Sequence, residues 1–523
     1  MELHRLKAVR VGISVTLFAL VAFIFLDFRN VLPPSVIRKA LYLQFIPSLM
    51  KFMDAAAIGA AGFIFVTILT LLFGRVYCSF LCPLGTLQDS ACFIGRIGRK
   101  RSKFKYIRPR NILRYSVFVL TALSFIAGVG FFINLLDPFS IFGRIFANLF
   151  RPMLISFNNF AAYAFERMDS SLLDGVEKAA TSPVSAGVSL VMLISIVWLS
   201  SRHGRLYCNT VCPVGALLGL LAKISFFKIG ISSDACRKCR LCENSCKAGC
   251  IDIKNMSVDF SRCVGCFNCF SACPENALRF EKRFRGYDSK PAPERERREF
   301  MLNSAMWIAA IAGLPEKAKG FFQSKPTRVS PGLINPIPPP GSVSVARFTS
   351  TCTACHLCVS ACPAQVLAPS FLEYGILGMM QPRMDFGSGH CNYDCNICMN
   401  VCPSGVLLPL SLERKQTTQL GVARFIMKNC VVFTDRTNCG ACSEHCPTKA
   451  VDMVPFPDAA NRRLLIPKVN PDICIGCGGC EHACPTRPFK AIYVIGNPVH
   501  KTAEKPLIKA VDKKIDYRED FPF

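Results

Sequence analysis

The sequence predicts an α-helical membrane domain followed by small α+β domains built around runs of cysteine. Three observations carry this prediction: the 523-residue chain is 51% hydrophobic, it has a formal net charge of +27, and it contains 30 cysteines. Basic loops that orient membrane segments explain positive charge in so apolar a chain, so we expect lipid contact and no nucleic-acid binding. Thirty cysteines indicate either disulfides or metal, and their spacing decides between the two.

Four uncharged apolar runs are expected to cross the membrane. The shortest have 16 residues, the lower limit for a hydrocarbon core of about 30 Å, and depend on tilt or on flanking basic residues. A buried core helix would explain one such run, but four within two hundred residues indicate a membrane domain. The runs are Val11–Leu26, Ala55–Phe73, Tyr115–Leu136 and Val184–Leu199.

Basic residues near the ends of these runs predict a cytoplasmic N-terminus. They occur in the N-terminal tail up to Arg10 and in the loop at 96–110, and no acidic residue lies between Ser90 and Leu136. The loop at 137–183 has four basic and five acidic residues and is expected outside. The protein is therefore predicted to be multi-pass.

A repeated cysteine motif follows the second and fourth runs, at their predicted cytoplasmic ends. GRVYCSFLCPLG occupies residues 74–85, and GRLYCNTVCPVG occupies residues 204–215. Two equivalent helix ends could bring four thiolates together, which suits an iron–sulfur cluster or a tetrahedral metal. A redox dithiol and inert thiols beside a helix-starting proline are the alternatives. The duplication favours a redox or metal site, formed by Cys78, Cys82, Cys208 and Cys212.

Two runs of the form C-x2-C-x2-C-x3-C then follow, at residues 236–246 and 263–273. This is the bacterial two-cluster ferredoxin pattern, in which the fourth cysteine of each run ligates the other cluster. Zinc sites pair their cysteines instead. Lys247 stands where proline is usual. The pattern predicts two [4Fe–4S] clusters, one held by Cys236, Cys239, Cys242 and Cys273, the other by Cys263, Cys266, Cys269 and Cys246.

Four more such runs follow residue 350, with enlarged first gaps at 391–395 and 430–439. If the fourth cysteine of each run again ligates the cluster of its partner run, these runs bind four more clusters, which makes about six in all. Only Cys92 and Cys250 are left over, and we expect them to be plain core or surface thiols. The four further sites are Cys352, Cys355, Cys358 with Cys402; Cys391, Cys395, Cys398 with Cys362; Cys430, Cys439, Cys442 with Cys484; and Cys474, Cys477, Cys480 with Cys446.

An internal export signal is predicted between the two groups of cysteine runs. RREFM at residues 297–301 resembles a twin-arginine signal, and the uncharged run Met301–Leu314 suits its apolar region or a short fifth, anchoring helix. A charged linker beside a short hydrophobic helix is the alternative. A Pro-rich stretch, Pro331–Pro340, leads into the last domain.

Two families resemble the two parts of the chain. Residues 1–285, with four apolar runs, two CxxxCP motifs and one two-cluster domain, resemble the NapH-type membrane ferredoxins, whose membrane module is shared with NosR and CcoG. Residues 295–500, with the RR start, PPPG at 338–341 and four cluster motifs, resemble the NapG/MauM-type exported ferredoxins. We interpret the chain as a natural fusion of two such proteins.

The fusion predicts five regions along the chain. They are a four-span domain (1–222), a cytoplasmic two-cluster domain (223–285), a linker with the signal or anchor (286–341), a periplasmic four-cluster domain (342–500) and a tail (501–523).

The resemblance implies a quinol dehydrogenase that passes electrons from the quinol pool, menaquinol included, to a periplasmic reductase or a c-type cytochrome. The sequence contains no nucleophile–base pair or phosphate loop that would indicate bond chemistry, so we assign no catalytic residue and expect no substrate-reducing site in the chain itself. A quinone pocket is expected in Leu41–Met53, with Pro47 and Lys51, or in the aromatic loop Phe139–Phe160.

The alternative function is a redox factor for the assembly or regulation of a metalloenzyme, as CcoG and NosR suggest. The sixteen cysteines of the last four runs favour the quinol dehydrogenase, because an assembly factor of the CcoG type does not need so long an exported chain.

Overall fold

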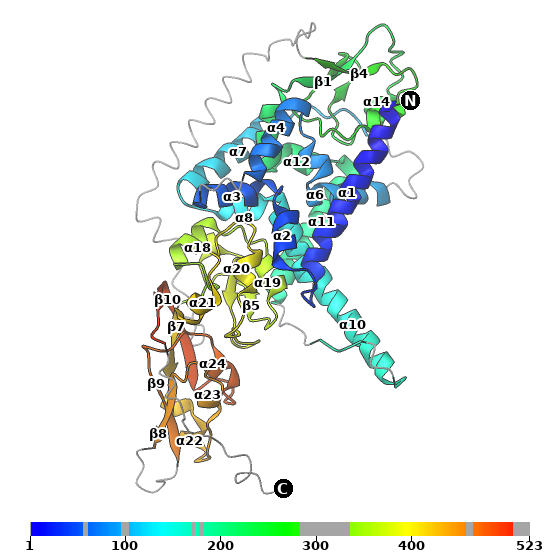
Figure 1. Cartoon of the computed structure of the whole chain (residues 1–523). Helices are drawn as coiled ribbons and strands as arrows, with labels where there is room; N and C mark the ends of the chain where they lie inside the picture. The colour runs from blue at the N-terminus through cyan, green and yellow to red at the C-terminus, as the bar shows by residue number, and fades with distance from the viewer. Residues whose placement is uncertain are drawn as a thin grey trace.

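The computed structural model describes residues 2–55, 61–95, 104–169, 173–176, 182–282, 335–456 and 464–505. In this part of the chain, a helical domain (residues 2–222) lies between two cysteine-rich units at its opposite ends (Figure 1). We call residues 227–282 the first unit and residues 335–505 the second unit. The predicted export signal, with RREFM and the run Met301–Leu314, lies outside the described residues.

Among the described residues, two helices are long and apolar enough to cross a membrane, α1 (Glu2–Leu26) and α11 (Pro183–His203). α1 has 25 residues and is therefore about 37 Å long, which exceeds a hydrocarbon core of about 30 Å. It contacts helix α15 of the first unit and helix α19 of the second, so it extends from one end of the helical domain to the other. The other two predicted spans contain the shorter apolar helices α4 (Gly62–Phe73) and α7 (Asn111–Ile126).

The run Tyr115–Leu136 is predicted as one segment but forms two helices, α7 and α8 (Phe131–Leu136). The chain turns between them at Gly128, whose φ of +77° lies in the left-handed region that glycine enters without steric cost. Apolar composition alone did not reveal this break, because Ala-Gly-Val-Gly is as uncharged as the helices on either side.

The region Phe139–Phe160 was expected to be a loop, and that expectation is wrong. It forms α9 (Pro138–Ile145), the π-helix η2 (Phe146–Phe150) and most of α10 (Arg151–Glu166), which projects from the body of the molecule (Figure 1). Asp137 caps α9 by accepting a hydrogen bond from the backbone N–H of Ser140, and Pro138 follows at the first helical position. Asp at the N-cap followed by Pro at the first helical position favours the start of a helix, which explains why this region is not a loop.

The remaining helices of this domain are shorter than α1 and α11. They are α2 (Pro34–Leu41), α3 (Phe45–Ala55), α5 (Tyr77–Phe80), α6 (Pro83–Ile94), α12 (Leu206–Thr210) and α13 (Pro213–Ala222).

Large apolar side chains are exposed on all four helices of the predicted spans. Examples are Val15 on α1, Phe65 on α4, Ile112 on α7, and Val191 and Ile194 on α11, whose exposures range from 42% to 65%. Contiguous exposed apolar surface of this kind is rare on soluble monomers and is typical of surfaces that face lipid or a partner.

The first unit is a small α+β fold that is closed by its outermost strands. β1 (Phe227–Ile231) pairs antiparallel with β4 (Leu278–Lys282), so the two ends of the unit lie side by side. Between them lie α14 (Leu241–Ser245), the hairpin of β2 (Ile251–Asp252) and β3 (Ser257–Val258), and α15 (Asn268–Ala272).

The second unit has a near lobe beside the helical domain and a far lobe beyond it (Figure 1). The near lobe, residues 335–410, consists of α18 (Val345–Thr351), α19 (Leu357–Ala361), β5 (Leu367–Pro369), η4 (Ile376–Gly378), β6 (Pro382–Met384) and α20 (Ile397–Val401), with β5 and β6 antiparallel. α21 (Leu412–Gln416) then leads into the far lobe, residues 417–505.

The far lobe is built on two antiparallel pairs. β7 (Thr418–Phe425) pairs with β10 (Ile492–Thr502), and β8 (Val451–Pro455) pairs with β9 (Leu465–Val469). Its short helices are η5 (Met427–Asn429), α22 (Val431–Thr434), α23 (Ala441–Glu444) and α24 (Gly479–Ala483).

Candidate functional site

The two CxxxCP motifs meet inside the helical domain in a reciprocal arrangement. Arg75 of the first motif donates from Nη2 to the carbonyl oxygen of Cys208 at 2.9 Å, and Arg205 of the second donates from Nη1 to the carbonyl oxygen of Cys78 at 2.7 Å. Both arginines are almost fully buried. The repeated sequence therefore builds a single structure with approximate two-fold symmetry.

The other repeated residues have the same structural role in both motifs. A Cβ on Gly85 would lie 2.3 Å from the carbonyl oxygen of Cys78, and one on Gly215 would lie 2.2 Å from that of Cys208, so only glycine lets each arginine reach its acceptor. The prolines that follow Cys82 and Cys212 occupy the first turns of α6 and α13, where a missing N–H costs nothing.

The four thiols of the motifs are all buried and lie within electrostatic range of one another. Cys208 Sγ lies 3.1 Å from Gln88 Oε1, the Gly215 N–H donates to Cys212 Sγ at 3.3 Å, and Arg75 Nη2 lies 3.7 Å from Cys78 Sγ. Among the described residues, no three His, Cys, Asp or Glu side chains lie close enough together to hold a single metal ion. The site combines soft, buried donors with fixed positive charge.

Asp89 is a residue that our sequence reasoning missed. Its carboxylate binds Arg10 at 2.8 Å, Arg205 at 2.9 Å and Lys247 at 3.3 Å, which ties α1, the second motif and the first unit together. Burial alone would raise the pKa of Asp89, but Arg205 and Lys247 outweigh burial and lower it, so the group stays ionised. A sequence signal existed, because Asp89 is the only acidic residue between Asp54 and Asp137.

Lys247 and Arg10 thereby acquire specific roles. Lys247 replaces the usual proline after the fourth cysteine of its run, and besides binding Asp89 it accepts a hydrogen bond from the Arg205 N–H at its carbonyl oxygen, at 2.9 Å. Arg10 is one of the basic residues that predict a cytoplasmic N-terminus. It is 3% exposed and belongs to this buried network.

The first unit brings together the two predicted sets of cysteines in two cavities. One cavity, of about 300 Å³, is lined by Cys236, Cys239, Cys242 and Cys273 among apolar and basic neighbours. The other, of about 360 Å³, is lined by Cys246, Cys263, Cys266 and Cys269 with Ile, Val and Phe side chains.

Cys250 was expected to be a plain thiol, and it lines the second of these cavities as a fifth cysteine. Its Sγ lies 3.6 Å from Cys246 Sγ. Cys92, the other leftover cysteine, is buried against α11, where its thiol donates to the carbonyl oxygen of Ser200 at 3.0 Å.

In the near lobe, the thiols gather in the crossed sets that the spacing predicts. Burial raises the pKa of Cys358, and the nearby thiols of Cys355, Cys352 and Cys402 raise it further. Burial likewise raises the pKa of Cys398, and the remaining three members of the second set, Cys391, Cys362 and Cys395, raise it further.

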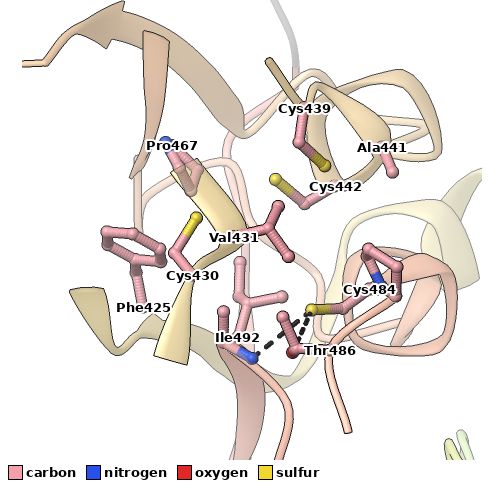
Figure 2. A pocket seen from close by; sticks show the side chains of 12 residues that line it. Phe425, Cys430, Val431, Cys439, Ala441, Cys442, Pro467, Cys484, Thr486 and Ile492 are labelled. Carbon is pink, nitrogen blue, oxygen red and sulfur yellow. Dashed lines mark hydrogen bonds between the residues drawn. The ribbon is translucent and has the colours of Figure 1, made fainter. Parts of the chain in front are cut away.

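In the far lobe, a cavity of about 350 Å³ is lined by Cys430, Cys439, Cys442 and Cys484 (Figure 2). Cys484 Sγ accepts the backbone N–H of Ala491 at 3.3 Å and lies 3.1 Å from Thr486 Oγ1. The nine-residue separation of Cys430 from Cys439 thus still allows all four thiols to surround one cavity. The last set assembles around Cys480, which has Cys477, Cys474 and Cys446 as its nearest charged neighbours.

A backbone pattern recurs in the four runs of plain C-x2-C-x2-C spacing. In each, the residue before the second cysteine and the residue after it have positive φ, as in Ala354 (+50°) and His356 (+62°), or Gly476 (+71°) and Gly478 (+81°). The other two pairs are Lys238 with Arg240 and Gly265 with Phe267. Turns of this kind direct successive backbone N–H groups into one concavity, which stabilises an anionic group such as a thiolate-ligated cluster.

These observations test whether the residues fit a [4Fe–4S] cluster. Each cavity with four thiols draws three from one run and one from its partner run, and its remaining lining is mainly apolar. Four cysteine thiolates in a protected cavity with inward-pointing N–H groups are what such a cluster requires, so the residues fit.

The first unit is attached directly to the CxxxCP motifs. Arg75 donates to the carbonyl oxygen of Ser261, and the Ser79 hydroxyl donates to that of Gly265, at 3.2 and 3.3 Å. Phe80, within the first motif, contacts Phe267 with ring centroids 6.3 Å apart.

The near lobe docks on the opposite end of the helical domain. A Cβ on Gly143 would lie 2.2 Å from the carbonyl oxygen of Cys355, so α9 and this cysteine loop are in backbone contact. His356 Nε2 lies 2.6 Å from the carbonyl oxygen of Met380 and must carry the proton, while Nδ1 faces Asn148 of η2 at 3.3 Å. Burial lowers the pKa of His356 to about 3, so the imidazole is neutral.

Between the motifs and the near lobe lies a buried arginine, Arg144. It is 1% exposed and lies within electrostatic range of Asp137, Tyr207 and Cys355. Tyr207, from the second CxxxCP motif, donates from its hydroxyl to the carbonyl oxygen of Leu136 at 2.8 Å. Arg144 thus lies within electrostatic range of the second CxxxCP motif at Tyr207 and of the near lobe at Cys355.

Families of iron–sulfur domains match the chain along most of its cysteine runs. A 4Fe-4S binding domain matches residues 55–105 and 185–232, which include both CxxxCP motifs, and another matches residues 233–249. 4Fe-4S dicluster domains match residues 259–366, 351–407 and 435–487. The chain therefore carries several 4Fe-4S domains.

Curated proteins are similar to about half of the chain. The putative electron transport protein YccM of Escherichia coli is 26% identical over 49% of the chain and 62% of its own length. The ferredoxin-type protein NapH of Haemophilus influenzae is 23% identical over 48% of the chain and 75% of its own length. The methylamine utilization ferredoxin-type protein MauN of Paracoccus denitrificans is 26% identical over 33% of the chain and 48% of its own length.

No solved structure matches the chain significantly. With the cysteine geometry, these similarities support a NapH-like iron–sulfur protein with several 4Fe-4S domains.

Proposed function

We propose that the protein oxidises quinol in a bacterial inner membrane and conducts the electrons to a periplasmic reductase or c-type cytochrome. The observation that carries this proposal is the position of the helical domain between two cysteine-rich units, with the paired CxxxCP motifs inside it. Such an arrangement suits electron transfer along the long axis of the molecule rather than bond chemistry at one site.

Six [4Fe–4S] clusters are assigned to the six crossed sets of cysteines named above. The clusters supply one-electron redox chemistry, and the protein fixes their positions, their hydrogen bonds and their shielding from water. The CxxxCP thiols are proposed as a redox site between the first unit and the near lobe. Arg75 and Ser79 connect them to the first unit. Toward the near lobe, Arg144 lies within electrostatic range of both Tyr207 and Cys355.

The order of sites in the second unit follows from its contacts. The set containing Cys355 lies against α9, and the set containing Cys391 lies next, since the Cys391 N–H donates to the carbonyl oxygen of Cys477 at 2.9 Å. The set containing Cys430 occupies the far lobe, which is remote from the helical domain (Figure 1). We propose this last site as the exit to a soluble acceptor.

The proposed topology has four spans, a cytoplasmic first unit and a periplasmic second unit. The exposed apolar side chains on α1, α4, α7 and α11 support four lipid-facing helices, and the opposite positions of the units support separate compartments. Export of the second unit is proposed to depend on Arg297 and Arg298. Changing both to lysine should leave that unit protected from protease in intact spheroplasts, whereas the unaltered protein should be cut.

Reduction by a quinol tests the function. The purified protein, which should contain about twenty-four irons, is mixed anaerobically with a menaquinol analogue, cluster reduction is followed by EPR, and a c-type cytochrome is then added. Cluster reduction followed by cytochrome reduction supports the proposal. Cluster reduction without onward transfer favours the assembly or regulatory role, and no reduction contradicts quinol oxidation.

A cysteine variant tests the role of the CxxxCP site. Cys212→Ser should abolish electron transfer from quinol to the first unit while leaving the six sets of cluster cysteines intact. Unchanged transfer in this variant would return these thiols to an inert, structural role.

A further inference from the structure

A cavity at the junction of the helical domain and the near lobe is lined by both. Its open space is about 320 Å³, a figure that includes space open to solvent. α2, α3 and the turn between them contribute five lining residues, and the loop after α20 contributes two. The lining residues are Arg38, Leu41, Tyr42, Ser48, Lys51, Cys402 and Pro403.

Cys402 makes this cavity unusual. We assigned this cysteine to the cluster site that lies against the helical domain, so a molecule in the cavity would touch a ligand of that cluster directly. The packing around it is close: a Cβ on Gly405, whose φ is +74°, would lie 3.1 Å from Lys51 Cγ. Glycine at this position lets α3 approach the cysteine loop.

The polar groups of the cavity are hydrogen-bond donors. Within the described part of the chain, neither Arg38 nor Lys51 has a hydrogen-bond or ion-pair partner, although Lys51 is half-buried. The Tyr42 phenol is 39% exposed, and Ser48 is held in place because its Oγ accepts the Phe63 N–H at 2.9 Å. Two cations, a phenol and a hydroxyl suit the oxygens of a small, planar polar head.

The surroundings of the cavity are apolar and face the proposed membrane surface. α2 buries Ile37 and Leu41 while Arg38 and Lys39 occupy its last turn, the pattern of a helix at the boundary of lipid and water. Val36 and Met53 nearby are 41% and 58% exposed. A lipid-soluble molecule with a polar head can therefore reach the cavity from the bilayer.

We propose that this cavity binds the head of a quinol and is the point where electrons enter the second unit; the inference rests on the proposed function. Oxidation of one quinol to quinone releases two electrons and two protons. The electrons pass Cys402 one at a time and reduce two clusters of the second unit by one electron each, and the protons leave to water. Arg38 and Lys51 stabilise the quinol oxygens as their protons depart.

A photolabelling experiment tests the position of the site without relying on turnover. An azido-quinone is bound to the full-length, cluster-loaded protein, the complex is illuminated, and the labelled peptides are identified by mass spectrometry. We expect label within residues 38–53 or 402–405, and its loss when a non-azido quinone competes. Label confined to residues 138–166, or label that quinone does not displace, would overturn the assignment.

Variants of two neighbouring cations provide a matched test. Lys51→Met and Arg38→Gln should each raise the KM for a menaquinol analogue about tenfold or more, because a charge-assisted hydrogen bond is lost. Lys39→Gln, on the same helix but outside the cavity, should match the unaltered protein. Reduction of all clusters by dithionite should be equal in every variant, which shows that they fold.

The outcomes separate this inference from the proposed function. If quinol fails to reduce the clusters of the unaltered protein, the function itself is wrong. If quinol reduces the unaltered protein and the Lys51→Met and Arg38→Gln variants equally well, the function stands and the site is wrong. Phospholipid that copurifies with the unaltered protein and is lost in Lys51→Met, without quinone labelling, would make the cavity a lipid head-group site.

Discussion

The arginine of the repeated motif is the residue on which the centre of the molecule depends most. Arg75 donates to Asn209 Oδ1 at 2.7 Å, to the Ser261 carbonyl oxygen and to the Cys208 carbonyl oxygen, so a single guanidinium joins both motifs to the first unit. The planar fork of donors matches these divergent acceptors, whereas a lysine ammonium on a flexible stem does not.

Arg75→Lys should therefore destabilise the protein although the charge is kept. At least one buried acceptor would lose its donor, which costs about 1 to 3 kcal/mol in the free energy of unfolding. The measurement is thermal unfolding in detergent. Arg202→Lys, an exposed arginine at the end of α11, is the control and should unfold like the unaltered protein. Equal midpoints for Arg75→Lys and the unaltered protein would contradict the bridging role.

Asp89→Asn should be more damaging than its small change in shape suggests. Three cations would lose a buried anionic partner, and breaking buried ion pairs from one side costs about 3 to 5 kcal/mol. Since the pKa of Asp89 is lowered by folding, the carboxylate stabilises the fold above about pH 4 and this contribution is lost only at lower pH.

The destabilisation by Asp89→Asn should accordingly be constant between pH 5 and 8, measured by thermal unfolding. Asp234→Asn, which changes an exposed carboxylate of the first unit, is the control. A stability difference that vanishes at pH 7 would show that the network contributes nothing.

At the scale of elements, the cysteine loops depend on backbone conformation as much as on thiols. Gly476 and Ala354 occupy equivalent positions with positive φ, one with glycine and one with alanine. At Gly476 the backbone of Gly421 lies 2.5 Å from where a Cβ would be, so glycine is required there by packing as well as by conformation.

Gly476→Ala should reduce iron content by up to one cluster and lower the thermal midpoint, because the loop can no longer pack on β7. Ala354→Gly is the matched variant at the equivalent position of the near lobe. Ala354 has a positive φ, which glycine adopts at a lower steric cost than alanine. The variant should therefore leave the iron content unchanged and should not destabilise the folded loop. Loss of iron in Ala354→Gly, or full iron in Gly476→Ala, would contradict this account of the loops.

Elements differed in how far the sequence predicted them. The assignment of clusters from cysteine spacing stays a prediction, and the structure places Cys430, with its long gap, in one cavity with Cys439, Cys442 and Cys484. The break of the third apolar run at Gly128 and the helices of residues 138–166 were not foreseen, since both depend on local backbone geometry that apolar composition conceals. The role of Asp89 was not predicted because its three partners are distant from it in sequence.

At the scale of the whole molecule, the proposed electron path depends on the contact between the helical domain and the near lobe. No pattern in the sequence indicated that contact, because it joins residues about two hundred positions apart, such as Asn148 and His356. It consists of close backbone approaches at Gly143 and Gly130, both of which lack room for a Cβ. It also includes the side-chain contact of His356 with Asn148.

Gly143→Val should separate the near lobe from the helical domain without unfolding either. The new Cβ would lie 2.2 Å from the Cys355 carbonyl oxygen and 2.8 Å from the Phe25 ring, and backbone on one side cannot yield as a flexible side chain could. We expect dithionite to reduce every cluster, quinol to reduce none in the second unit, and protease to cut between the helical domain and the second unit faster than before. Gly187→Ala, on a spanning helix with open space around its Cα, is the control and should behave like the unaltered protein. If quinol reduced the second unit of Gly143→Val normally, electrons would not need this contact, and the proposed path through the molecule would be wrong.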